Sequence, residues 1–128
     1  MSYYFYKTVD DSFDDAVERV TARLADAGFG VLTTIDVSDT LKKKIDVDFK
    51  RYTILGACNP GFAYKALLAE DKIGTMLPCN VIVQETADGT VQVAAIDPVA
   101  SMTAIQNEAL AGIAAEVQTM LKNVIEGM

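Results

Sequence analysis

A stripe of apolar residues in the first quarter of the chain predicts an amphipathic helix. Apolar side chains recur there at steps of three and four residues, the spacing that places them on one side of an α-helix. Ser12, with Asp15 three positions later, is typical of a helix start, and Gly28 is typical of the position just after a helix. The residues predicted to face the core are Phe13, Ala16, Val17, Val20, Leu24 and Ala27.

The same periodicity predicts a longer helix over residues 107–126, with Asn107 as its cap and Glu108 in its positively polarised first turn. A shorter helix is predicted before it, over residues 98–105, because Asp97-Pro98 interrupts the preceding strand. The buried stripe of the long helix is predicted to contain Leu110, Ile113, Val117, Met120, Leu121 and Val124.

Short runs rich in β-branched and aromatic residues predict five strands. Two short helices are predicted over residues 38–46 and 61–70. The order of these elements predicts one α+β domain over residues 1–128, in which helices pack on one face of a mostly antiparallel five-stranded sheet. The last two strands are joined by a glycine-containing turn that is typical of a hairpin. The predicted strands span residues 3–9, 30–37, 52–57, 80–86 and 90–96.

Composition narrows the possible functions. The chain has 11 basic and 18 acidic residues, a formal net charge of −7, which argues against binding to nucleic acid and against a polybasic membrane contact. It contains no histidine, so it lacks the commonest general base and the commonest transition-metal ligand. It shows neither a secretory leader nor a span of about 18 uncharged apolar residues, so a cytoplasmic location with free thiols is predicted.

Both cysteines lie in the stretch from Tyr52 to Gln84, and each is followed by asparagine, at Cys58-Asn59 and Cys79-Asn80. Twenty residues separate the two thiols, which excludes a CxxC redox motif. If the flanking strands are antiparallel, both thiols lie at the same end of the sheet. If the helix between them is a crossover between parallel strands, they lie at opposite ends. The shortness of that helix favours the antiparallel arrangement.

These residues have plain structural uses as well as functional ones. The cysteines are either small buried apolar side chains or reactive thiols, and two thiolates are too few for a tetrahedral zinc site, so no metal site is predicted. Asn59 is either only a helix cap before Pro60 or part of a pocket for a small polar or anionic ligand, with Tyr64 as its wall. No catalytic residue is assigned. The candidate ligand-binding residues are Cys58, Asn59, Pro60, Tyr64, Cys79 and Asn80.

Five motifs carry a resemblance to a known family. The runs Ile54–Pro60 (ILGACNP), Ala63–Leu67 (AYKAL), Ile73-Gly74, Leu77–Val81 (LPCNV) and Asp97-Pro98 resemble the family named domain of unknown function 302, over nearly the whole chain. The resemblance implies a compact α+β domain with a TATA-binding-protein-like arrangement of sheet and helices, and a homodimer. A shared fold carries no inference of DNA binding. The family has no established activity, so the resemblance assigns neither catalytic residues nor a cofactor.

Two functions fit the sequence. The first is a non-enzymatic homodimer that binds a small molecule or a partner around the two Cys-Asn corners. The second is a thiol-dependent redox or metal-handling protein that uses Cys58 and Cys79. Thiol labelling separates them, because cysteines that react only after denaturation are core residues, whereas a fast reaction near neutral pH indicates a stabilised thiolate.

Overall fold

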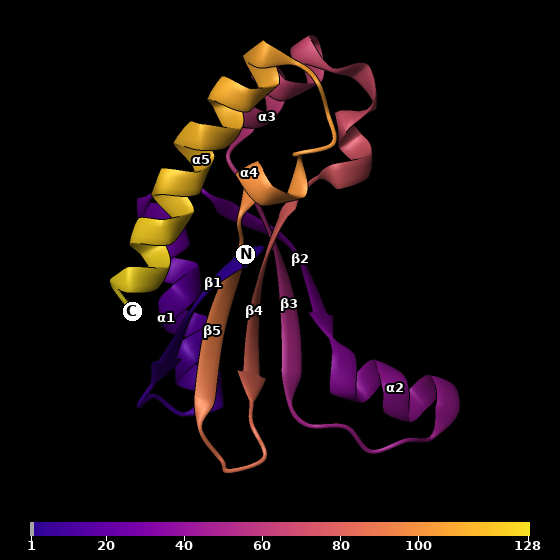
Figure 1. Cartoon of the computed structure of the whole chain (residues 1–128). Coiled ribbons are helices and arrows are strands. Elements are labelled where there is room, and N and C mark those ends of the chain that lie inside the picture. Colours follow the sequence, from indigo (N-terminus) through magenta and orange to yellow (C-terminus); the bar gives the residue numbers. More distant parts are fainter. Residues whose placement is uncertain (1) are drawn as a thin grey trace.

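The computed structural model describes residues 2–128 as a five-stranded sheet with helices around it (Figure 1). The strands lie in the order β1-β5-β4-β3-β2, and each is antiparallel to its neighbours. The predicted α+β fold with an antiparallel five-stranded sheet is therefore confirmed. The strands are Tyr4–Val9 (β1), Gly30–Asp36 (β2), Tyr52–Cys58 (β3), Cys79–Glu85 (β4) and Val91–Ile96 (β5).

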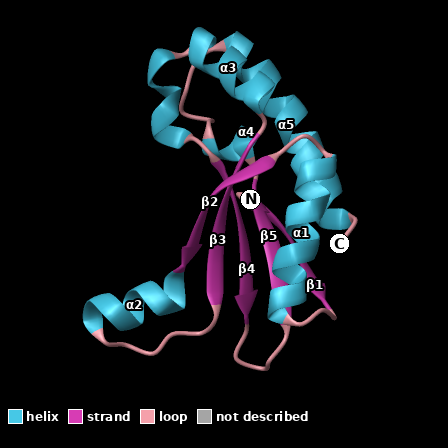
Figure 2. Ribbon diagram, turned by 180° about the vertical axis from the view of Figure 1, so that it is seen from behind, coloured by secondary structure: helices cyan, strands magenta, loops and turns pink. Residues whose placement is uncertain are grey.

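Two long helices, α1 (Phe13–Asp26) and α5 (Glu108–Glu126), cover one face of the sheet and leave the opposite face of the strands open (Figures 1 and 2). The helix α2 (Val37–Ile45) extends outward from the end of β2, and none of its residues is buried. Three short helices gather at the end of the sheet where β3 ends and β4 begins: α3 (Pro60–Ala69), η1 (Asp71–Met76) and α4 (Pro98–Ser101).

The main core lies between the sheet and the two long helices. Side chains alternate along each strand, so every second residue faces the helices. Leu24 of α1 and Leu121 of α5 are completely buried there, and burial of a side chain of this size stabilises a fold by about 1.5–3 kcal/mol. The strands β3, β4 and β5 supply the buried residues Leu55, Val81, Val83 and Val93.

Both predicted apolar stripes face this core, with differences at their margins. In α1, Val17 is only partly buried, and in α5 the same holds for Ile113 and Met120. In addition, α5 buries Ala114 and Ile125, which the periodicity did not single out. The buried side of α5 is wider than a single stripe because α5 packs against α1 and α3 as well as against β1 and β5.

The short helix predicted over residues 98–105 is shorter in the structure, because α4 ends at Ser101. The Thr103 hydroxyl donates to the carbonyls of Val99 at 2.9 Å and Ala100 at 3.0 Å. These carbonyls are acceptors that a continuing helix needs for its own amides, so the side-chain contacts compete with the helix. The chain leaves the helical path there and crosses to α5.

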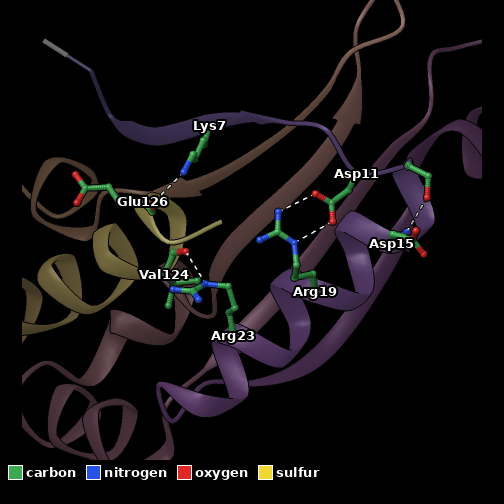
Figure 3. Close-up of polar contacts among 8 residues, drawn as sticks. Lys7, Asp11, Asp15, Arg19, Arg23, Val124 and Glu126 are labelled. Atoms are coloured by element: carbon green, nitrogen blue, oxygen red, sulfur yellow. Dashed lines mark hydrogen bonds and ion pairs between the residues drawn. The ribbon is translucent and has the colours of Figure 1, made fainter.

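Polar contacts join β1 and α1 to the C-terminal end of α5 (Figure 3). Lys7 Nζ donates to the carbonyl of Glu126 at 2.9 Å, and Arg23 Nε donates to the carbonyl of Val124 at 3.2 Å. The last carbonyls of a helix have no partner within the helix and carry partial negative charge, so two cations stabilise this end. The contacts hold one half of α5 on the sheet, while its other half reaches beyond the sheet toward α3 (Figure 1).

Candidate functional site

An apolar cavity of about 330 Å³ lies at the end of the sheet where β3 ends and β4 begins. Its walls include residues of α3, η1, α4 and the N-terminal half of α5, which lie together at the upper end of the sheet in Figure 1. A second, smaller core cluster sits beside the cavity and is formed by the buried residues Ala66, Ile73 and Leu110.

Small side chains leave this space open. Ala66 of α3 and Ala114 of α5 are buried on two helices that pack together, and each presents only a methyl group to the cavity. The cavity opens to solvent beside Leu32 and Leu67, which line it and yet remain 67% and 45% exposed. The small residues in its lining are Ala57, Ala63, Ala66, Gly74 and Ala114.

The two cysteines lie together at this end of the sheet. Strands β3 and β4 are antiparallel, and Ala57, the residue before Cys58, pairs with Cys79. Both thiols line the cavity, and both cysteines are free. The predicted antiparallel arrangement, with both thiols at the same end of the sheet, is therefore confirmed.

Burial makes the Cys79 thiol hard to ionise. The apolar surroundings, and secondly the charge that Cys58 would carry nearby, raise the pKa of Cys79 from the ordinary 9.0 to about 11. The thiolate is the nucleophilic form of cysteine, and a raised pKa lowers its population at neutral pH. Cys79 thus has the character of a small apolar side chain that lines a cavity.

Asn59 caps α3. Its side-chain oxygen accepts a hydrogen bond from the backbone N–H of Phe62 at 3.2 Å, and Pro60 occupies the first turn of the helix. The amide nitrogen of Asn59 lies against Gly28, where an added Cβ would come within 3.0 Å of it. Gly28 has a positive φ of 90°, so a glycine there permits both the turn after α1 and the position of Asn59.

The structure does not bring all six candidate residues to one cavity. Cys58, Asn59 and Cys79 line it, whereas Pro60 and Tyr64 do not, and Tyr64 is 66% exposed on α3. Asn80 lies on the opposite face of the sheet, because neighbouring residues of a strand point to opposite sides. The two Cys-Asn pairs are therefore not equivalent: Asn59 follows a strand and caps a helix, whereas Asn80 lies inside a strand.

Sequence reasoning missed much of the cavity wall. The residues of α5 that line it were predicted as part of an ordinary core stripe, and the small residues Ala66 of α3 and Ala114 of α5 were local signs of open space. No pattern in the sequence indicates that the more distant parts of the chain meet at this cavity. The wall residues outside the candidate set include Phe29, Pro98, Met102, Leu110, Ile113 and Val117.

The lining of the cavity favours neutral ligands. It contains no Asp, Glu, Lys or Arg side chain, so it offers an ion no opposite charge. Within residues 2–128, no group of three or more Cys, Asp or Glu side chains is arranged to hold a metal ion. Nor does this part of the chain contain a helix with the length and apolarity needed to cross a membrane.

Other proteins share both the sequence features and the fold of this chain. The family profile described as "Domain of unknown function DUF302" matches residues 5–128. The crystal structure of an uncharacterized conserved DUF302 protein from Bacillus stearothermophilus is similar with a TM-score of 0.91 and 28% identity, over 98% of this chain and 98% of that chain. No curated protein matches the chain. The chain belongs to the DUF302 family.

Proposed function

We propose that the protein is a non-enzymatic, cytosolic homodimer that binds a small neutral apolar molecule in the cavity between β3, β4, α3 and α5. The single observation that carries this proposal is an open cavity of about 330 Å³ with an almost wholly apolar lining beside Cys58, Asn59 and Cys79. Small-molecule sites have volumes of roughly 300–1,000 Å³ and predominantly apolar walls. The cavity is at the lower end of that range, which favours a compact ligand.

Water is a poor occupant of this space. A cavity of about 330 Å³ is large enough for several water molecules, and every ordered water needs two to four polar partners. The only polar side chains in the lining are those of Cys58, Asn59 and Cys79, and the Asn59 oxygen already caps α3. An apolar molecule that displaces weakly held water gains affinity, so the cavity selects for ligands without charge.

The thiol-dependent alternative has less support. A redox or metal-handling role for Cys58 and Cys79 needs a thiolate, and the pKa of Cys79 is raised to about 11 by burial and by its neighbour Cys58. Two sulfurs supply only half of a tetrahedral zinc site. The same pair serves a binding site well, because protonated thiols are weakly polar and pack like apolar groups.

Binding of the neutral fluorescent probe N-phenyl-1-naphthylamine tests the proposal. The wild-type protein should bind the probe in the cavity and enhance its emission. Replacement of the buried lining residue Ala114 by Phe should fill the space and weaken binding at least tenfold. Ala115→Phe is the matched control, because Ala115 is the next residue on α5 and is exposed.

The outcome is decided by the two variants together. Loss of probe binding in Ala114→Phe, with binding retained in Ala115→Phe and native circular dichroism in both, would support a ligand in the cavity. Equal binding by the wild-type protein and Ala114→Phe would place the probe elsewhere on the surface and refute the proposed site. No binding by the wild-type protein would count against an apolar ligand of this size.

A further inference from the structure

The face of the sheet that α1 and α5 leave open has an apolar centre. Alternation along the paired strands places the residues of this face in rows that cross the sheet. Figure 1 looks toward this face, with β5, β4 and β3 in front. The middle row crosses all five strands and consists of Tyr6, Ala94, Ile82, Ile54 and Ile35.

The five strands place no charged side chain on this open face, and the one cation that the contacts within residues 2–128 show beside a residue of the face is Lys50, whose Nζ lies 5.9 Å from the centre of the Tyr52 ring. The five strands contain three charged residues, and each alternates onto the side of the sheet that the helices cover. Lys7 pairs with Val93, Asp36 with Thr53 and Glu85 with Val91, and all three partners are buried on that side. A sheet face that meets water normally carries polar outward residues, and this face carries tyrosine, isoleucine, alanine and uncharged amides instead.

We propose that this open face is the interface between two copies of the chain. The inference rests on the homodimer of the proposed function and assigns the surface that forms it. Each copy has a net charge of −7, so two copies repel each other, and a contact surface without acidic side chains adds no close like-charge contacts to that repulsion. A two-fold interface brings the same patch of both copies together, and the strand residues of this patch carry no acidic side chain and no other charge in either copy. Tyrosines, which are enriched at interfaces, stand on it at Tyr4, Tyr6 and Tyr52.

The geometry places Ile82 at the centre of this interface. The strand β4 is the middle strand of the sheet, and Ile82 lies halfway along it, on the apolar middle row. Five strands spaced about 4.8 Å apart, with about six residues each, present a face of about 24 by 20 Å. The relief of the side chains enlarges the accessible area beyond this projection, so two such faces reach the lower range of stable interfaces, about 1,200 Å² in total.

A hollow of about 530 Å³ on this face is bordered by Tyr3, Tyr4 and Tyr6 on β1 and near its start, and by Tyr52 on β3. In the dimer the partner covers this hollow. A small molecule bound in the hollow of a lone chain is the competing possibility, and it predicts a monomer. The oligomeric state therefore separates the two occupants.

Opposite charges at position 82 provide the test. Sedimentation equilibrium should give the wild-type protein twice its chain mass of 13.8 kDa. In Ile82→Asp and in Ile82→Lys, like charges meet at the two-fold axis, and the dissociation constant should rise at least 100-fold. An equimolar mixture of the two variants should form a heterodimer. Leu68→Asp is the control, because Leu68 is 69% exposed on α3, away from the open face and outside the lining of the apolar cavity.

Each possible result supports or overturns the assignment of the open face as the dimer interface. A monomeric wild-type protein would overturn the interface. Dimers of unchanged affinity in Ile82→Asp would place the interface elsewhere, with the homodimer intact. Tyr6→Asp keeps the test decisive should Ile82→Asp fail to fold, because Tyr6 is 58% exposed on the same row. Probe binding in the apolar cavity should be unchanged in the monomeric variants, so failure of the interface and failure of the ligand site are distinguishable.

Discussion

Cys79 is expected to react with thiol reagents about 100 times more slowly than the same residue in the unfolded chain. Burial beside the cavity, and secondly the neighbouring Cys58, raise the pKa of Cys79 from the ordinary 9.0 to about 11. Two pKa units change the thiolate fraction about 100-fold at any pH below the ordinary value, and the thiolate is the reacting species. Restricted access through the mouth of the cavity would slow the reaction further.

The assay uses the Cys58→Ser variant, in which Cys79 is the only thiol. Because Cys58 is the smaller cause of the shift, most of the raised pKa should remain. The rate of alkylation by iodoacetamide is measured against pH, with the same variant in urea as the reference. In the folded protein the rate should still rise steeply at about pH 10. A rate that levels off near pH 9, or that equals the rate in urea, would refute the burial argument and revive the thiol-dependent function.

The same shift makes the stability of the fold depend on pH. The folded state holds the Cys79 proton more tightly than the unfolded state, so this contribution is fully present below the unfolded value of 9.0 and is lost as pH rises toward 11. At pH 10 the loss is about 1.4 kcal/mol, since one pKa unit corresponds to about 1.36 kcal/mol. Urea denaturation should show that this alkaline loss is larger in the wild-type protein than in Cys79→Ala. Equal losses would contradict the raised pKa.

Three further substitutions test the local architecture. Gly28→Ala should lower the free energy of unfolding by about 1–2 kcal/mol, because Gly28 has a φ of 90° and the Cβ of an alanine there would press against Asn59. Gly112→Ala should instead raise the free energy of unfolding by about 0.5–1 kcal/mol, because Gly112 is at an exposed position of α5 with open space around it. Urea midpoints measure both, and a shift of the same sign in both would contradict the reasoning. Asp11→Asn should cost at most about 1 kcal/mol at neutral pH, because it breaks the pair that Asp11 forms with Arg19 at 2.7 Å (Figure 3). That hydrogen-bonded pair lowers the pKa of Asp11 below its ordinary 3.8, so its contribution is present above that value and is lost as pH falls below it; acid titration of stability should therefore be flatter in the variant.

The fold could be predicted from the sequence because its elements follow local rules. The apolar stripes at steps of three and four residues, and the caps Ser12, Asn59 and Asn107, all mark helices that the structure contains. Where the prediction was wrong, a side chain competed with the backbone: Thr103 bonds back to the carbonyls that a longer α4 would use. The order of the strands was not predictable, because it depends on pairings between residues far apart in the sequence.

The candidate site was predictable only in part, for a geometrical reason. A motif marks residues that are close in sequence, whereas a cavity collects side chains by direction. Asn80 follows Cys79 directly and lies on the opposite face of the sheet, while Ala114, distant in sequence, lines the same cavity as Cys79. The dipeptide Cys-Asn therefore marks the end of the sheet at which the cavity lies, but it does not define which residues line that cavity.

This alternation in β4 links the two proposals. Cys79, Val81 and Val83 point toward the helices, and the first of them lines the apolar cavity. Asn80, Ile82 and Gln84 point toward the open face and its hollow. Because side chains alternate with a period of two, a shift of β4 by one residue against β3 would carry Ile82 into the core and Cys79 out of the cavity. The register of β4, in which Ala57 pairs with Cys79 and Ile54 with Ile82, therefore sets the composition of the proposed ligand site and of the proposed dimer interface together.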